Sequence, residues 1–314
     1  MPSSGSVDFS INRDEIIRHA MLEATILGVD QVPNSDDISD CSFRLNLIVK
    51  QLQGRADFGA NLKVFARKTA YLFLQQGQSV YSVGPSGDHW TASYSTTTLG
   101  AAKSASATAL TLAAAVGANA DFIGIVLDDG SIGWSTISAG GGTTSLTLPA
   151  NSLGAASSGA RVFTYTTKGR RPLSLLTGVL RDTNTRDTIV AVNKTRQDYE
   201  ALPSKTADGT LSWLAYEATL TNGTIYTDCE PSDVTRVVRV VFLGSPEDFD
   251  AITDTPDYPQ EWFRPLVKLL AVDISPMYGK LVSQDLKDAA TGAIAVAQNT
   301  DPETTDVFFE PGRE

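Results

Sequence analysis

Few residues of this chain are of the kinds that build reactive centres. Its 314 residues include two cysteines, Cys41 and Cys229, and two histidines, His19 and His89. Two cysteines are too few for a disulfide framework, and a lone histidine lacks the partners that catalysis or a metal ion needs. Cys41 falls on the apolar side of an expected helix, so we expect it to be a buried free thiol.

Long apolar runs and targeting signals are lacking as well. No apolar run approaches the ~20 residues needed to span a bilayer. The first residues, Met1-Pro2-Ser3-Ser4-Gly5, are not a basic segment followed by an apolar stretch, so they do not resemble a secretory signal. We therefore expect a protein that folds in a reducing cytoplasm and has no membrane partner.

Charge is sparse and mostly of one sign. Charged residues make up 19% of the chain, and 36 acidic residues oppose 25 basic ones for a net charge of -11. Gripping nucleic acid requires clustered Lys and Arg, so this balance argues against it. It remains compatible with a protein that surrounds a DNA duplex and lets it slide. A polar surface with little charge suits broad contacts with other chains, but it is also found on ordinary β domains.

Signatures of catalysis are also lacking. The sequence contains no phosphate-binding loop, no G-x-G-x-x-G after a strand and no Cys/His cluster with metal-ligand spacing. Neighbouring carboxylates, such as Glu247 with Asp248 and Asp254 with Asp257, leave a hydrolase open, because a glycosidase needs two carboxyl groups facing each other across a cleft. We expect no enzyme, and neither a cofactor nor a metal ion.

The N-terminal part has the pattern of two helices. Asn12 and Glu15 form a capping-box pattern, and apolar residues recur at helical spacing from Ile16 until Gly28, which is a natural helix end. A second helix is expected from Ser35 to Gly54. Each helix carries one apolar stripe, so we expect both to pack on another layer, most simply a sheet.

β-Strand patterns dominate the middle of the chain. Strands are expected at Lys68–Leu74 and Ser79–Val83, and again from Leu173 to Leu243, where Asn222-Gly223 marks a hairpin. Between them the composition shifts to Ala, Gly, Ser and Thr, with short β-like runs. Asp128-Asp129-Gly130 lies between two of these runs and is typical of a hairpin turn. We do not expect a calcium site there, because the other ligands of a calcium loop are missing. This stretch predicts an all-β domain inserted into the main body.

The C-terminal part returns to helical patterns. Pro259 to Trp262 opens a helix that Pro276 and Gly279 interrupt, and a last amphipathic helix ends near Asn299. The polar, acidic remainder carries the apolar residues Val307, Phe308 and Phe309. It cannot form a core of its own, so we expect it to be mobile or to dock on a partner.

Together these elements predict an α+β fold. A helical bundle from the N- and C-terminal helices is expected to pack with a small β-sheet body that carries the inserted all-β domain. Five segments are predicted: 1–83, the helical hairpin and first strands; 84–169, the inserted β domain; 170–250, the β-rich body; 251–299, the C-terminal helices; and 300–314, an extended tail.

Three segments, in this order behind the helical hairpin, carry a resemblance to a known family. They are Phe73-Leu74-Gln75-Gln76-Gly77-Gln78-Ser79-Val80-Tyr81-Ser82-Val83-Gly84; Tyr199-Glu200-Ala201-Leu202-Pro203-Ser204-Lys205 with Gly223-Thr224-Ile225-Tyr226; and Glu247-Asp248-Phe249-Asp250 leading into Asp257-Tyr258-Pro259-Gln260-Glu261-Trp262. The chain resembles the head-to-tail adaptors, or tail accessory factors, of short-tailed bacteriophages (podoviruses). The insert departs from the smallest members of that family and is similar to an extra β domain in longer ones.

The resemblance implies a structural virion protein of the short tail, assembled in the host bacterial cytoplasm. Family members form a homo-oligomeric ring, commonly of twelve copies, that joins the portal protein to the tail nozzle and extends the channel through which double-stranded DNA passes without specific binding. A tail fibre or tailspike is a further possible partner. The resemblance places portal contacts on Val307, Phe308 and Phe309. Ring packing is expected of the helices that carry Ile38, Leu45, Leu52, Trp262, Leu266 and Leu286.

Two other functions stay open at this point. A tail-associated peptidoglycan hydrolase would use the paired carboxylates. A receptor-binding or decoration module would use the low-charge β insert.

Overall fold

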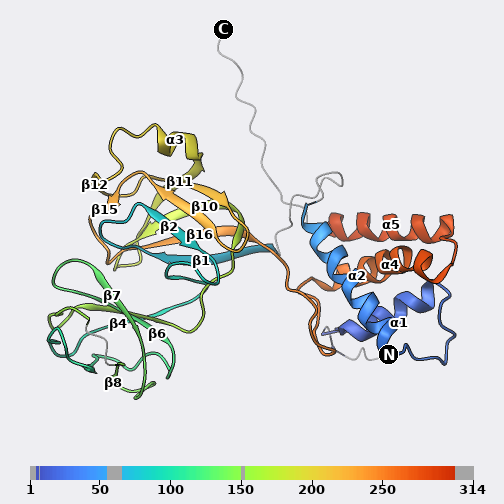
Figure 1. Ribbon diagram of the computed structural model, residues 1–314, viewed down its shortest axis with the longest axis horizontal. Helices are drawn as coiled ribbons and strands as arrows, with labels where there is room; N and C mark the ends of the chain where they lie inside the picture. Colours follow the sequence, from blue (N-terminus) through green and yellow to red (C-terminus); the bar gives the residue numbers. More distant parts are fainter. Residues whose placement is uncertain (1–4, 7, 55–65, 150–152, 301–314) are drawn as a thin grey trace, which may run out of the picture. The chain divides into compact units, whose positions relative to one another are not determined.

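The computed structural model describes residues 5–6, 8–54, 66–149 and 153–300. The chain forms two compact units, one from residues 1–67 with 245–314 and the other from residues 68–244. The first is helical and the second is built of β-strands (Figure 1). The protein is thus an α+β protein whose N- and C-terminal helices pack together, as predicted. In the described residues, no helix combines the length and apolar character required to cross a membrane.

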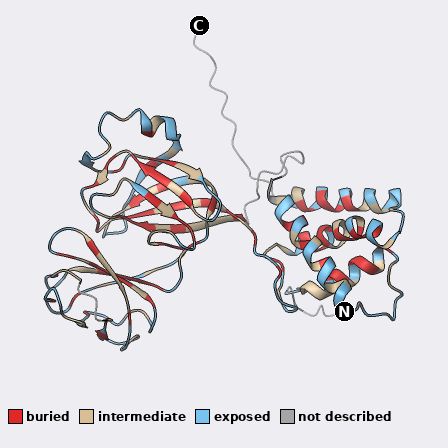
Figure 2. Cartoon of the chain, in the orientation of Figure 1, coloured by how far each residue is buried: buried red, intermediate tan, exposed pale blue. Residues whose placement is uncertain are grey.

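The helical unit is arranged around one apolar helix, α4 (Phe263–Ile274). α1 (Arg13–Glu23), α2 (Ser35–Gly54) and α5 (Gln284–Thr300) all pack against α4. Short 3-10 turns, η2 (Gln260–Trp262) and η3 (Ser275–Tyr278), flank it. Figure 2 shows the buried residues of this unit along the sides of the helices that face one another.

The predicted packing of α1 and α2 on a sheet is wrong. Their stripes, among them Ile16 and Met21 of α1 and Leu45 of α2, share one core with Leu266 and Leu270 of α4. The reason is that α4 is apolar around much of its circumference, so it offers each neighbouring helix a surface. That property cannot be recognised from the stripes of α1 and α2 themselves.

Both ends of α1 follow from local chemistry, but only the beginning was predicted correctly. Asn12 Oδ1 accepts a hydrogen bond from the Glu15 N–H, and Glu15 Oε2 accepts one from the Asn12 N–H, each at 2.9 Å. The helix ends at Glu23, before the predicted stop at Gly28. Thr25 takes a left-handed conformation (φ 54°), and the Ile26 N–H donates back to the Met21 carbonyl at 2.9 Å. Ile26 therefore packs on the core from a loop.

The β unit contains an eight-stranded, nearly closed mixed sheet with the strand order β2-β14-β13-β11-β10-β16-β1-β3. Its strands are β1 (Arg67–Phe73), β2 (Val80–Val83), β3 (Trp90–Thr91), β10 (Pro172–Arg181), β11 (Asp187–Lys194), β13 (Trp213–Ala218), β14 (Gly223–Thr227) and β16 (Val237–Gly244). β11 and β13 are parallel, because the chain crosses between them through the short helix α3 (Arg196–Glu200). A short separate pair, β12 (Asp208–Gly209) with β15 (Glu230–Pro231), is also parallel.

The first two strands belong to this sheet, although the five-segment division groups them with the N-terminal helices. They do not pair with each other: β2 pairs with β14 at one edge, and β1 lies between β16 and β3 near the other. Tyr81 of β2 and Leu72 of β1 are both buried in the core of the sheet. Trp90 of β3 is buried there too, so the main sheet continues past Gly84 before the insert begins.

The insert is all-β, as predicted. Its four-stranded antiparallel sheet has the order β4-β9-β6-β7, made of β4 (Ser95–Thr98), β9 (Arg161–Tyr165), β6 (Phe122–Val126) and β7 (Ile132–Thr136). A second pair joins β5 (Ala109–Thr111) to β8 (Ser145–Thr147). The predicted hairpin at Asp128-Asp129-Gly130 connects β6 to β7, with Gly130 in a left-handed conformation (φ 87°). Besides its own core, the insert packs aromatic rings against Phe73 of β1.

Candidate functional site

The side chains predicted for ring packing lie in or next to the core of the helical unit. Leu45 and Leu266 are fully buried and Trp262 is 5% exposed. The other three, Ile38, Leu52 and Leu286, pack against the same core and are partly buried. Within the chain these residues hold the four helices together. Contact with a neighbouring copy would therefore fall to other side chains on the same helices.

Exposed large apolar side chains concentrate on the helical unit. Of the twelve such side chains in the described part of the chain, nine belong to this unit and three to the β unit. The nine are Phe9, Val29, Val32, Phe43, Leu47, Ile252, Met277, Leu281 and Val296. Scattered exposed apolar residues are normal on any protein, and in the described part of this chain most of them belong to the helical unit.

The outer face of α2 is the clearest part of this surface. Phe43 is 65% exposed and Leu47 is 48% exposed. They are four residues apart, so they lie one turn apart on the same side of the helix. The opposite side of α2 carries Cys41, Leu45 and Val49, which are fully buried against α1 and α4. α2 thus has two apolar faces, of which the described residues cover only one.

Charge is divided between the units as unevenly as the exposed apolar residues are. Residues 1–67 and 245–314 contain 12 basic and 23 acidic residues, whereas residues 68–244 contain 13 of each. The helical unit therefore carries the whole net charge of -11, and the β unit is neutral. Ion pairs between separate segments of the helical unit include Lys268 with Glu23, Arg44 with Asp273, and Lys50 with Asp248.

The portal-binding residues predicted in the tail, Val307, Phe308 and Phe309, lie outside the described residues. Their role stays a prediction.

The paired carboxylates have structural partners. Asp248 Oδ1 lies 2.6 Å from Lys50 Nζ. Asp254 Oδ2 accepts the N–H groups of Asp250 and Ala251 at 2.7 and 2.6 Å, and these hydrogen bonds lower the pKa of the Asp254 carboxyl. A catalytic general acid needs the opposite shift, toward neutral pH. Asp254 therefore acts as the cap of a turn.

The two histidines lie in different surroundings. His19 is exposed on α1. His89 stacks on Trp134 with ring centroids 3.7 Å apart, and its Nδ1 is hydrogen-bonded to Tyr165 Oη at 2.6 Å. Burial, and to a smaller extent the charge of Lys168, lowers the pKa of His89 to about 3. The imidazole is enclosed by aromatic rings and packs the insert against β1.

Neither buried cysteine has the setting of a reactive thiol. Cys41 and Cys229 are both buried and free, as expected for Cys41. Burial raises the pKa of the Cys41 thiol and, together with the charge of Asp228, raises that of Cys229 to about 11. Reactive cysteines have lowered pKa values, so both residues serve as core side chains.

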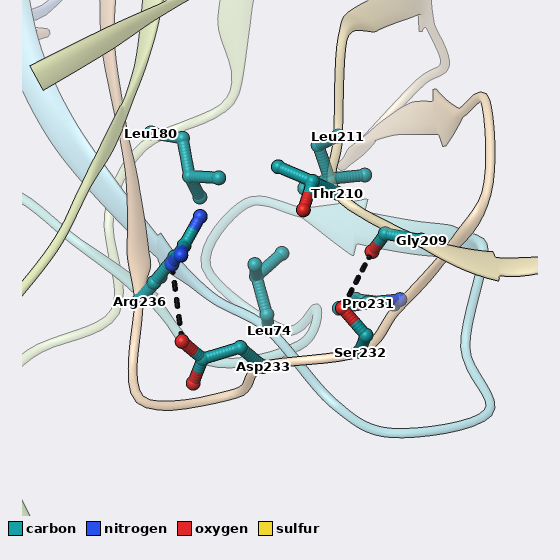
Figure 3. Close-up of a pocket in the computed structure, with 9 residues that line it drawn as sticks. All are labelled: Leu74, Leu180, Gly209, Thr210, Leu211, Pro231, Ser232, Asp233 and Arg236. Carbon is teal, nitrogen blue, oxygen red and sulfur yellow. Dashed lines mark hydrogen bonds and ion pairs between the residues drawn. The ribbon is translucent and has the colours of Figure 1, made fainter.

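The hollow shown in Figure 3 is too small for a substrate. It lies between β1, β10 and the segments around β12 and β15, and its volume is about 10 Å³. That is room for about one water molecule. Arg236 Nε pairs with Asp233 Oδ2 at 3.0 Å on one side, and Ser232 Oγ donates to the Gly209 carbonyl on the other.

The described residues include no group of three or more His, Cys, Asp or Glu side chains placed to hold a metal ion. Comparison with known proteins adds no assignment: no family model matches the chain, and no curated protein is significantly similar to it.

Proposed function

We propose that this protein is a structural component of a short bacteriophage tail. In this proposal it forms a ring, of about twelve copies by the family resemblance, between the portal protein and the tail nozzle. The ring extends the DNA channel and has no catalytic role. The observation that carries the proposal is the concentration of uncovered apolar side chains on the helical unit.

The physical argument starts from the geometry of a closed ring. A ring repeats one heterologous contact, so each subunit needs two different faces that fit each other. The outer side of α2, with Phe43 and Leu47, is suited to be one of them. Burying such a side chain contributes roughly 1.5–3 kcal/mol. Neighbouring copies that cover both residues would gain part of the free energy that assembly requires, and the rest of the contact would have to supply the remainder.

The charge distribution supports the same proposal. A channel wall that attracted phosphates would retain the DNA that must move through it. The helical unit carries the entire net charge of -11, so a wall built from it would repel the duplex and let it slide. The neutral β unit, with its insert, would then face other tail proteins, including a tail fibre or tailspike.

Mixing the purified chain with its portal complex, followed by sedimentation velocity, tests the proposal. The wild-type chain is expected to co-sediment with the portal as one large species. The double variant Phe43→Ser, Leu47→Ser is expected to remain a folded monomer, because both side chains are exposed and do not support the core. The matched control is Ile189→Ser, which alters a side chain on the β unit that is 83% exposed.

Two results would count against this proposal. If the α2 double variant assembles as well as the wild type, the uncovered apolar face has another purpose. If the wild-type chain never joins the portal, the adaptor function itself fails.

A further inference from the structure

A polar hollow in the insert has the chemistry of a ligand site. Three segments line it: the Ser93–Ser95 connection between β3 and β4, Gly117 and Asp121 before β6, and Thr164–Thr166 at the end of β9. Its volume is about 150 Å³. Apart from the Gly117 backbone, every lining residue carries a side-chain oxygen, and none contributes a basic group, a thiol or an imidazole.

Asp121 brings a buried carboxyl group to this hollow. The residue is only 6% exposed, and its Oδ2 accepts the Ala118 N–H at 2.7 Å. That bond fixes the turn from Ala118 to Asp121, but it uses one of the two carboxylate oxygens. No Lys, Arg or His of the described residues lies within ion-pair distance of Asp121. A buried carboxylate without a positive partner is strongly unfavourable unless something else compensates its charge.

Thr164 provides a second, independent observation. The residue is 2% exposed, and its hydroxyl oxygen has no hydrogen-bond partner among the described residues. Buried hydroxyl groups are nearly always satisfied, and Thr164 is one of the residues that line the hollow. The turn at Asp121 does not account for the unpaired hydroxyl of Thr164, because Thr164 lies in β9.

We propose that this hollow binds a hard cation of the calcium class. Such ions prefer carboxylate, hydroxyl, carbonyl and water oxygens, which are the donors present here. A volume of about 150 Å³ holds the ion with several waters at roughly 30 Å³ each. The ion would neutralise Asp121, give Thr164 Oγ1 a partner and join three segments of the insert. With one carboxylate among its ligands, the site binds weakly, with a Kd on the order of 0.1–1 mM.

Tyrosine-sensitised terbium luminescence of the full chain tests this proposal directly. Tyr94 and Tyr165 line the hollow, so Tb³⁺ bound there is excited through their rings. The wild-type chain is expected to give saturable emission that millimolar Ca²⁺ displaces. Asp121→Asn keeps an oxygen for the Ala118 N–H but removes the charge, and it is expected to weaken Tb³⁺ binding at least tenfold. Thr164→Val, which fits the same space, is expected to weaken binding severalfold.

The matched control is Asp129→Asn, an exposed turn carboxylate in the same insert, which is expected to bind Tb³⁺ as the wild type does. Emission from Asp121→Asn equal to the wild type, or no sensitised emission at all, would overturn the proposal. Displacement of Tb³⁺ by methylammonium but not by Ca²⁺ would also overturn it and would assign the hollow to an ammonium group. The adaptor function does not depend on any of these results.

Discussion

His89 illustrates how a residue type that often marks a catalytic site can serve packing instead. Its ring lies against Trp134 and its Nδ1 meets Tyr165 Oη, so the imidazole joins the insert to the region beside β1. The sequence alone predicts only that a lone histidine lacks catalytic partners. Its role in packing depends on Trp134 and Tyr165, which are 45 and 76 positions away along the chain, and no local pattern connects them.

The lowered pKa of His89 leads to a prediction for stability against pH. In the unfolded chain His89 titrates near 6.5, whereas in the folded protein its pKa is about 3. Between these values the unfolded state binds a proton that the folded state does not. The contribution of His89 to the free energy of unfolding is therefore fully present above about pH 6.5. It is lost as the pH falls toward 3, and the free energy of unfolding then decreases by at most about 1.4 kcal/mol per pH unit.

Urea unfolding of the wild type and of His89→Gln between pH 4 and pH 7 measures this effect. Carboxylates contribute equally to both proteins, so the difference in slope reports on His89. The variant is expected to lose stability less steeply below pH 6.5. Identical slopes would show that the imidazole is protonated as easily in the folded protein as in the unfolded chain.

At the scale of single elements, signals within a few residues predicted the structure well. The capping pattern at Asn12 and the turns at Gly130 and Gly223 are all found where the sequence places them. In each case a side chain or a glycine acts on backbone close to it, so the relevant physics is contained in a short segment. The premature end of α1 was missed because Thr25, a residue that rarely adopts positive φ, forms the reversal.

The cap of α1 allows a prediction at this scale. Asn12→Ala removes the acceptor of the Glu15 N–H and is expected to lower the free energy of unfolding of the helical unit by about 1 kcal/mol. Ser10→Ala, at an exposed position just before the cap, is the control and is expected to change stability little. Denaturant unfolding followed by circular dichroism measures both. Equal stabilities would mean that tertiary packing alone fixes the start of the helix.

Pairings between distant elements could not be predicted. The sheet joins β1 to β16 and β11 to a parallel β13, and the helical unit joins both ends of the chain through α4. An apolar stripe indicates that one face of a helix is covered, but it does not identify the element that covers it. For this reason the stripes of α1 and α2 predict packing on a sheet as readily as packing on another helix. The same ambiguity affected the candidate site. Leu45 and Leu266 belong to the core of the helical unit, whereas Phe43 and Leu47 lie outside the apolar stripe of α2, so the stripe does not point to them.

The place of Asp121 and Thr164 in one site could not be predicted for a related reason. One is a single acidic residue before a strand and the other a threonine within a β-like run, and neither is unusual in sequence. What distinguishes them is burial beside the same hollow, with no cationic partner for Asp121 and no hydrogen-bond partner for Thr164 Oγ1 among the described residues. Only the pairing of β6 with β9 brings these two parts of the insert together.

For the whole molecule, the main feature is the division of properties between its two units. The helical unit carries the net negative charge and most of the exposed apolar side chains, and the β unit is neutral and carries the insert. Such a division is expected if one unit assembles with copies of itself around DNA while the other contacts different proteins. In the proposed ring, Phe43 and Leu47 would be covered by a neighbouring copy.

Electron cryo-microscopy of the chain bound to its portal complex tests this account most directly. The account predicts a closed ring of density below the portal in which helical units touch their neighbours and the α2 face with Phe43 and Leu47 is buried between copies. A map with no ring at the portal, or a ring in which that face of α2 points into solvent, would contradict it.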